Sequence, residues 1–331
     1  MLTVFISANA LAAAFKSSSV VVKDASGTVE RRIYTEISRG AAKAPVVILL
    51  NGLIYDIERW TPVAETLADQ GLTVVRMSFS PQPESLRLMK ETETASFMVR
   101  GLELSVLADD VKRVLNHHRI QRAVTVVGLS YGATVATEFA KTYPKRTKNV
   151  LLLSPLVVPL DNYDASSAPL RSMLDGIRFW ESAPCLAYGW LNPWLCTSTD
   201  FWYDSFYNYF YENYLNLRVA KTPPGLEPAM YKKSVFQLVR ATRNYDLKVE
   251  VASLKNVHMV IADDDEAHLK ADQIKAWDLV PFAERRSLAT FTGVVHAVPD
   301  EAPTATATWI ENVAKMSADM QNGEHYIVGG R

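Results

Sequence analysis

A chain of 331 residues is long enough for one large α/β domain or two smaller ones, with a substantial buried core. Apolar residues make up 48% of the chain and charged residues 21%, the balance of a globular protein in water. The formal net charge of -1 argues against a nucleic-acid partner, which would normally require an excess of basic residues. No apolar run in the sequence reaches the roughly 18 residues needed to cross a bilayer.

The N-terminal stretch is mostly apolar, but it lacks the basic start of a secretory signal, since the first Lys or Arg is Lys16. We therefore expect a short N-terminal helix or tail and a cytoplasmic protein, with export as the alternative. The chain has two cysteines, Cys185 and Cys196, which are too few for a disulfide framework. Reduced, buried thiols are the default expectation, and a disulfide in an oxidising compartment is the alternative.

The predicted elements alternate along the chain. Residues 19–24 and 29–38 read as two strands joined by a glycine-containing turn, which predicts an antiparallel hairpin. A continuous apolar run, typical of a strand buried on both faces, covers residues 45–50. Residues 72–77, 123–127, 148–154, 257–261 and 286–291 read as further strands. Segments with helical features cover residues 56–70, 105–118, 231–243, 270–279 and 303–320. We expect Asp56 to cap the first of these helices and Gly71 to end it. This alternation predicts an α/β fold with a mostly parallel, doubly wound sheet.

Ser130 lies at the apex of the most informative stretch. The apolar residues 123–127 are followed by Gly-Leu-Ser-Tyr-Gly and then at once by a segment with helical spacing. A G-x-S-x-G sequence between strand and helix is typical of a nucleophile elbow, a sharp turn that lifts the serine clear of the sheet. Gly128 and Gly132 suit such a turn because the two backbones come too close for a Cβ. We interpret Ser130 as a nucleophile; a structural serine is the alternative.

Residues 157–250 interrupt the alternation of strand and helix. The aromatic residues of this segment include Trp180, Trp190, Trp194, Trp202, Tyr203, Phe206, Tyr207, Tyr209, Phe210, Tyr211 and Tyr214. We interpret the segment as a helical cap inserted in an α/β core formed by residues 1–156 and 251–331. It would lie over the carboxyl edge of the sheet, where ligands bind in open α/β folds. Most of the rings should pack inside the cap, and those that reach a pocket favour apolar acyl or aromatic groups.

With these elements, residues 20–320 resemble an α/β-hydrolase with an inserted cap. That family presents its nucleophile, acid and histidine in this chain order. A serine hydroxyl is a poor nucleophile until a neighbouring base takes its proton. The resemblance selects His296 as that base, because it follows the last predicted strand and precedes the last helix; an exposed loop histidine is the alternative. The other histidines are expected at a helix end near the surface (His117, His118), in a buried strand (His258), in the turn after it (His268) and in the tail (His325).

The resemblance places the acid just past the penultimate of these strands, in the Asp-Asp-Asp-Glu sequence of residues 263–266. The family's small residue, three positions before the acid, matches Ala262 and selects Asp265. Shifting the match by one selects Glu266, and Asp264 is a third candidate. The alternative is that this acidic cluster is a solvated turn or a cation site, although the oxygen ligands of one short turn rarely complete the coordination shell of a cation. We therefore expect neither a metal nor another cofactor.

Two backbone amides should hold the oxyanion that develops on a substrate carbonyl. The resemblance implies the amides of Tyr131, directly after the nucleophile, and Leu53, in the loop after the first buried strand. The family usually has His-Gly in that loop, whereas this chain has Asn51 and Gly52. We expect Gly52 to keep the backbone geometry and Asn51 to keep hydrogen-bonding capacity without titration. A second departure is the polar, proline-containing stretch 78–84, where many relatives carry Asp-x-x-Gly-x-Gly.

The sequence thus predicts a metal-independent serine hydrolase that cleaves a small-molecule carboxylic ester or thioester with an apolar acyl or aromatic group. The reaction would pass through an acyl-enzyme on Ser130. Serine at the elbow argues against dehalogenase and epoxide-hydrolase chemistry, which this fold performs with a carboxylate nucleophile. Acyl transfer and carbon–carbon bond hydrolysis use the same triad and stay open. Two further alternatives are a non-catalytic receptor with a capped pocket and an interfacial lipase whose aromatic cap docks on lipid. The sequence does not indicate an oligomeric state.

Overall fold

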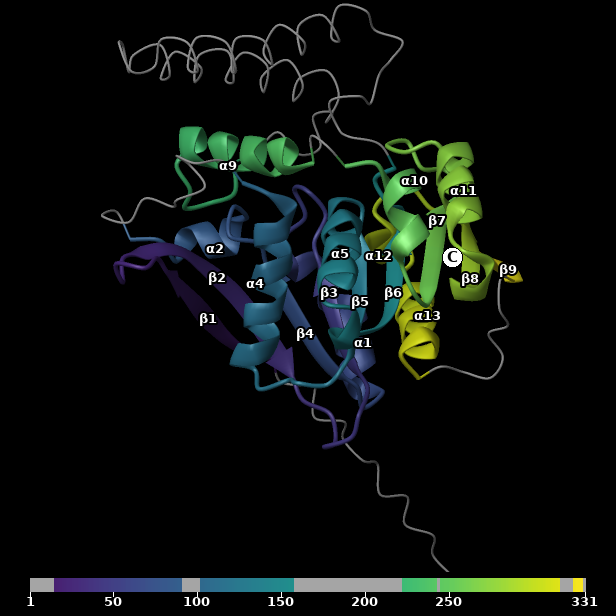
Figure 1. Ribbon diagram of the computed structural model, residues 1–331, viewed down its shortest axis with the longest axis horizontal. Helices are drawn as coiled ribbons and strands as arrows, with labels where there is room; N and C mark the ends of the chain where they lie inside the picture. The colour runs from purple at the N-terminus through teal and green to yellow at the C-terminus, as the bar shows by residue number, and fades with distance from the viewer. Residues whose placement is uncertain (1–14, 91–101, 158–221, 243–244, 316–323, 330–331) are drawn as a thin grey trace, which may run out of the picture.

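A nine-stranded sheet runs through the middle of the molecule, in the order β1-β2-β4-β3-β5-β6-β7-β8-β9 (Figure 1). It is seen in a computed structural model that describes residues 15–90, 102–157, 222–242, 245–315 and 324–329. The strands are β1 (Lys16–Lys23), β2 (Val29–Ser38), β3 (Val46–Leu50), β4 (Thr73–Ser78), β5 (Val124–Leu129), β6 (Thr147–Leu153), β7 (Val257–Ala262), β8 (Arg285–Thr292) and β9 (Glu324–Gly329).

Most of the strands run parallel. β1 pairs with β2, and β2 with β4, in antiparallel register, while every other neighbouring pair is parallel. The mostly parallel α/β sheet predicted from the sequence is therefore confirmed. Because parallel strands end at the same edge, the loops after β3, β4, β5, β7 and β8 meet there, at the edge where ligands bind in such folds.

Helices cover both faces of the sheet (Figure 1). The α-helices are α1 (Thr61–Asp69), α2 (Pro83–Arg87), α4 (Leu104–His117), α5 (Tyr131–Thr142), α9 (Pro228–Ala241), α10 (Leu247–Glu250), α11 (Lys270–Leu279), α12 (Val298–Glu301) and α13 (Pro303–Lys315). Short 3-10 turns are η1 (Ile57–Trp60), η2 (Pro144–Arg146), η4 (Val251–Ser253) and η5 (Phe282–Glu284). Asp56 precedes η1, but its side chain makes no capping hydrogen bond, so its predicted capping role is wrong. Gly71 does end this region, with φ of 84°.

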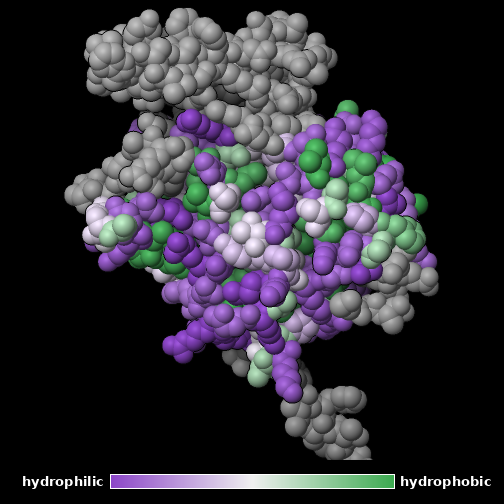
Figure 2. Space-filling model, in the orientation of Figure 1, coloured by the Kyte–Doolittle hydropathy of each residue, from purple (hydrophilic) through white to green (hydrophobic). Residues whose placement is uncertain are grey.

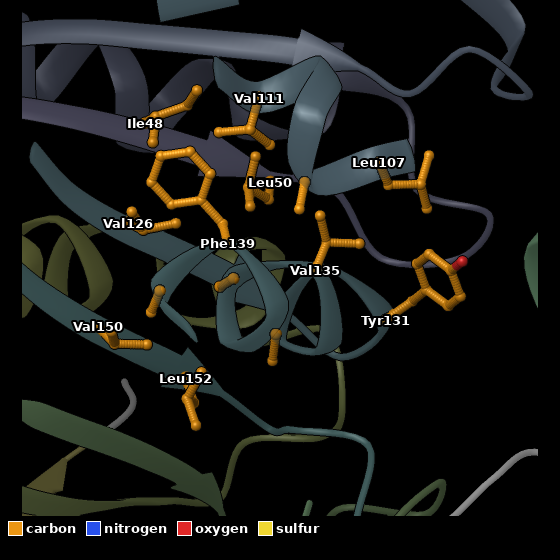
Figure 3. Packing of buried hydrophobic residues seen from close by; sticks show 14 of the residues in the cluster. Ile48, Leu50, Leu107, Val111, Val126, Tyr131, Val135, Phe139, Val150 and Leu152 are labelled. Atoms are coloured by element: carbon orange, nitrogen blue, oxygen red, sulfur yellow. The ribbon is translucent and has the colours of Figure 1, made fainter. Parts of the chain in front are cut away.

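The core has one apolar layer on each face of the sheet. Successive side chains of a strand point to opposite faces, so Ile48 and Leu50 of β3 pack against α4 and α5, together with Phe139 (Figure 3). Val47 and Leu49 of the same strand pack into the second layer, against α1 and α13. All five residues of β3 are buried, as expected for a strand covered on both faces.

Several elements differ from the sequence-based expectation. β9 was not predicted; it places His325 in a strand, with its Nε2 2.8 Å from Thr290 Oγ1, rather than in a tail. Its burial pattern explains the omission, because four of its six residues are exposed, Ile327 among them. The short helix α2 begins at Pro83, near the end of the polar stretch 78–84. His118, expected near the surface, is buried, and its Nε2 lies 3.1 Å from Thr35 Oγ1.

Most of the predicted cap lies outside the described residues, including its cluster of aromatic side chains and both cysteines. The predicted N-terminal helix or tail lies outside them too. The described part of the insertion contains α9, whose Val235 and Leu238 join the apolar layer of α4 and α5. The Arg87 guanidinium of α2 donates to the carbonyl oxygen of Pro224 at 3.1–3.2 Å, just before α9. The division into core and cap stays a prediction.

The face in Figure 2 is mainly polar, with apolar side chains near α10 and α11. The exposed large apolar residues around these two helices are Val249, Leu269, Leu279 and Phe282. Among the described residues, no helix is both long enough and apolar enough to span a bilayer.

Candidate active site

Ser130 forms the turn between β5 and α5. Its φ of 51° and ψ of -112° lie outside the regions that residues with a side chain normally adopt, which marks a locally strained backbone. The Ser130 amide donates to the Leu153 carbonyl of β6 at 2.8 Å, and its carbonyl accepts from the Ala133 amide at 3.0 Å. The neighbouring strand and the new helix therefore hold this conformation, and the side chain stays partly exposed.

The two glycines of the elbow allow its close packing. A Cβ built on Gly128 would lie 2.2 Å from the Gly132 carbonyl oxygen, and one built on Gly132 would lie 2.3 Å from that of Leu50 in β3. Both clashes are with backbone, which cannot move aside. The steric reason inferred for these glycines from the sequence is confirmed.

Asp265 and His296 come from the loops after β7 and β8. His296 Nδ1 lies 3.0 Å from Asp265 Oδ1 and 3.1 Å from Oδ2, so the carboxylate faces this ring atom with both oxygens. The Asp265 side chain is fully buried, whereas that of His296 is 22% exposed. The Asp264 amide donates to the Val294 carbonyl at 3.1 Å and joins the two loops. A hydrogen bond at Nδ1 leaves Nε2 as the ring atom that is free to exchange a proton.

The Asp265 carboxylate has further donors around it. Oδ1 accepts from the backbone amides of Ala267 at 2.9 Å and His268 at 2.8 Å, and Oδ2 accepts from Gln273 Nε2 at 3.1 Å. Burial by itself raises the pKa of Asp265, but the hydrogen bond and the charge of His296 outweigh it and hold the pKa below its usual value. The group is therefore an anion near neutral pH and keeps a fixed direction.

The other acidic candidates make different contacts. The exposed Glu266 accepts the backbone amide of His296 at 3.3 Å, rather than its ring. Asp264 is exposed, and Asp263 forms an ion pair with Lys270. Among the described residues, no group of three or more His, Cys, Asp or Glu side chains is arranged to hold a metal ion.

His268 is a neighbour of the site that the sequence did not indicate. Its ring centroid lies 4.8 Å from that of His296, with the two planes at 80°, so the rings meet edge to face. Burial, followed by the charge of His296, lowers the pKa of His268 to about 3, so the ring is neutral. No spacing rule singles out this residue; only the turn after Asp265 brings it to His296.

The loop after β3 carries the predicted oxyanion residues. Asn51 is fully buried, and its Nδ2 donates to Gln82 Oε1 at 3.0 Å. The φ of Gly52 is not positive, and a Cβ built there would meet its nearest neighbour, the Cβ of Tyr55, at 3.4 Å. The structure therefore does not require a glycine at position 52, contrary to expectation. Leu53, the predicted amide donor, follows Gly52 in this loop and is buried.

The predicted residues lie along one edge of the sheet. Ser130 follows β5, Asp265 follows β7 and His296 follows β8. Tyr131 is the first residue of α5, in the turn whose amides have no acceptor within the helix. In the described chain no hydrogen bond joins the Ser130 hydroxyl to the His296 ring. In unliganded sites such a bond is often long and shortens only when substrate binds.

A doubly wound sheet with a strained serine elbow after a central strand, followed by an Asp–His pair, defines the α/β-hydrolase class of folds. Residues 45–180, less than half of the chain, match a family model described as the alpha/beta hydrolase fold. The chain therefore has the α/β-hydrolase fold. A comparison of its sequence with curated proteins found no match.

Solved structures share this fold at low sequence identity. MGS-M2, an alpha/beta hydrolase enzyme from a Medee basin deep-sea metagenome library, is 18% identical, with 89% of this chain and 98% of that chain covered and a TM-score of 0.58. A thermophilic esterase from Thermogutta terrifontis is 16% identical, with 90% and 99% covered and a TM-score of 0.58. The thioesterase domain from the curacin biosynthetic pathway is 18% identical, with 89% and 99% covered and a TM-score of 0.56. At these identities the likeness establishes the fold alone.

Proposed function

We propose that the protein is a serine hydrolase that cleaves a small-molecule carboxylic ester or thioester through an acyl-enzyme on Ser130. The observation that carries the proposal is the contact of both Asp265 carboxylate oxygens with Nδ1 of His296, on the sheet edge that also holds the strained Ser130 turn. This is the arrangement in which an acid orients a histidine as general base. Esterase and thioesterase folds among the structural neighbours agree with the proposed substrate class.

The proposed reaction begins when Ser130 Oγ attacks the substrate carbonyl carbon and His296 Nε2 takes the hydroxyl proton. The amides of Leu53 and Tyr131 hold the oxyanion of the tetrahedral intermediate. The intermediate collapses, the bond to the alcohol or thiol breaks, and the leaving group takes the proton from His296. Water then attacks the acyl-enzyme with His296 as base, which releases the carboxylic acid and restores Ser130.

Ser130→Ala tests this proposal. We expect wild type to react with a fluorophosphonate probe and to hydrolyse p-nitrophenyl esters, with a chain-length optimum that measures the acyl pocket. The variant should show no labelling and at least a roughly 10³-fold loss of kcat/KM, because the nucleophile is gone.

Ser154→Ala is the matched control, since Ser154 is a buried serine at the end of β6 on the same edge. It should keep both labelling and activity. A folded wild type that neither reacts nor hydrolyses would support the receptor alternative, and hydrolysis that survives in Ser130→Ala would refute the proposed nucleophile.

A further inference from the structure

We infer that Gln82 is a positioning residue for the oxyanion site: its side-chain amide fixes the peptide group whose N–H, that of Leu53, would bind the oxyanion. The inference rests on the proposed function. It assigns a role to a residue in the stretch 78–84, which departs from the family's usual sequence and for which the sequence suggested no function.

Gln82 lies between β4 and α2, and its side chain is buried. Oε1 accepts hydrogen bonds from the Phe79 backbone amide at 2.9 Å and from Asn51 Nδ2 at 3.0 Å. Nε2 donates to the Gly52 carbonyl oxygen at 2.7 Å. The side chain therefore joins the loop after β3 to the loop after β4, across the edge of the sheet where the candidate site lies.

Only one orientation of the Gln82 amide satisfies its neighbours. The Phe79 N–H can only donate, and the Gly52 carbonyl can only accept. If the amide rotated by 180°, donor would face donor and acceptor would face acceptor, with none of these groups reaching water. Leaving buried polar groups unpaired is costly, so the contact holds a single geometry.

The bond to Gly52 acts directly on the proposed oxyanion donor. The Gly52 C=O and the Leu53 N–H are the two ends of one planar trans peptide group and point in opposite directions. Fixing the carbonyl therefore fixes the direction of the N–H. Hydrogen bonds in a chain also polarise one another, so a peptide that accepts a bond from Gln82 is a stronger donor to an oxyanion. The Tyr55 amide also approaches this carbonyl, at 3.4 Å.

The loop needs such an external constraint. Gly52 has an ordinary φ and room for a Cβ, so neither a special backbone conformation nor close packing at that residue sets the loop geometry. Asn51, which stands where relatives usually have histidine, points its amide to Gln82. The buried Gln82 amide thus holds the loop after β3 at two neighbouring residues, through the side chain of Asn51 and the carbonyl of Gly52.

Gln82→Met tests the inference, because it keeps the side-chain length and removes all three hydrogen bonds. Full loss of one oxyanion donor lowers kcat by about 10²–10³-fold. The variant keeps the Leu53 N–H but loosens it, so we expect kcat on the best p-nitrophenyl ester to fall by about 10- to 100-fold, with KM little changed. Affinity for a boronic acid, which forms a tetrahedral adduct with the serine, should fall in parallel.

Gln82→Glu adds a readout that a purely structural role would not give. When the introduced glutamate side chain is a carboxylate, it accepts a hydrogen bond from the Phe79 amide but repels the Gly52 carbonyl oxygen. When the side chain is a neutral acid, its O–H can donate to that carbonyl oxygen again. Burial raises the pKa of a carboxyl group. The ratio of variant to wild-type kcat should therefore rise as the pH falls. This variant also decides the question if Gln82→Met does not fold.

Ser80→Ala is the matched control in the same loop. It removes the buried hydrogen bond from Ser80 Oγ to Asp110 Oδ2, 2.9 Å long, and should lower the unfolding midpoint while kcat and boronate affinity stay at wild-type values. Wild-type kcat and boronate affinity in folded Gln82→Met, or a Gln82→Glu ratio that does not change with pH, would overturn the inference. Failure of the proposed function looks different, because wild type would then show no hydrolysis, or hydrolysis would survive in Ser130→Ala.

Discussion

The imidazole of His296 is held from two directions. The Asp265 carboxylate fixes its Nδ1, and the ring of His268 packs against it at 4.8 Å. Since the pKa of His268 is lowered to about 3, this second ring adds no positive charge beside His296 when that ring becomes an imidazolium. A neutral neighbour can thus restrain the proposed base without opposing its protonation. The contact limits rotation of the ring, and the carboxylate selects its tautomer.

Asp265→Asn should lower kcat by about 10⁴-fold near neutral pH, with little change in KM. The amide Nδ2 can donate to Nδ1 and stabilise the tautomer in which Nε2 carries the proton and cannot act as base, which costs about this much in serine-hydrolase triads. The measurement is steady-state hydrolysis of a p-nitrophenyl ester. Asp264→Asn, one residue away on an exposed side chain, is the control and should resemble wild type. A large loss in Glu266→Gln, with an active Asp265→Asn, would assign the acid to Glu266 instead.

The sequence indicates some residues of the site and not others for a physical reason. Ser130 and His296 can be proposed from the sequence because each sits at a fixed place relative to one strand and one helix. The contacts of Gln82 and His268 instead depend on how separate loops pack across the sheet edge. Gln82 lies 31 residues from Asn51 in the chain, and no local pattern encodes that meeting. Such residues become visible only when the loops are placed in three dimensions.

The elbow depends on how closely β5, α5 and β3 approach one another. Gly132 in the first turn of α5 lies against the carbonyls of Leu50 and Asn51, so the same glycine that permits the turn also lets the helix contact the loop after β3. The position of Ser130 relative to that loop is therefore set by the packing of the elements and not by the serine alone.

Gly132→Ala should destabilise the fold by about 3 kcal/mol, the upper range for overpacking a tight core, and should abolish activity. Its Cβ would lie 2.3 Å from the Leu50 carbonyl oxygen and 2.6 Å from that of Asn51, so α5 has to move away from β3. The measurement is urea unfolding together with ester hydrolysis. Gly329→Ala is the control, because a Cβ there meets nothing within 4 Å and should change neither quantity. Wild-type stability in Gly132→Ala would contradict this account of the elbow.

Elements buried on both faces were the easiest to predict. The runs that became β3, β5 and β7 are mostly apolar, and every residue in them is buried, because helices cover both of their faces. β9 lies at the edge of the sheet, and its exposed residues reduce that signal. The start of α1 was misplaced for another reason: Asp56 is a good capping residue, but a turn of 3-10 helix comes first and the side chain bonds to no helix amide.

Buried histidines make the stability of the whole molecule depend on pH. Burial is the main factor that lowers the pKa of His118 to about 4, and that of His258 and His268 to about 3. In the unfolded chain a histidine titrates near about 6.5. Between these values the unfolded state binds more protons than the folded state, so the free energy of unfolding falls as the pH drops below about 6.5. Each such group costs about 1.4 kcal/mol per pH unit over that range.

His258→Gln should make the protein less sensitive to acid. His258 lies inside β7, with its Nδ1 2.7 Å from Ser287 Oγ in β8. The charge of Arg286 is a second factor that lowers its pKa. Between pH 7.5 and pH 5.0 the variant should lose about 2 kcal/mol less unfolding free energy than wild type, which is one group over the roughly 1.5 units below pH 6.5. Urea unfolding at the two pH values measures this without reference to activity, so protonation of His296 does not enter the comparison. His117→Gln, at an exposed histidine, should follow wild type. An equal loss in His258→Gln and wild type would show that His258 is not held neutral in the folded protein and that other groups carry the acid sensitivity.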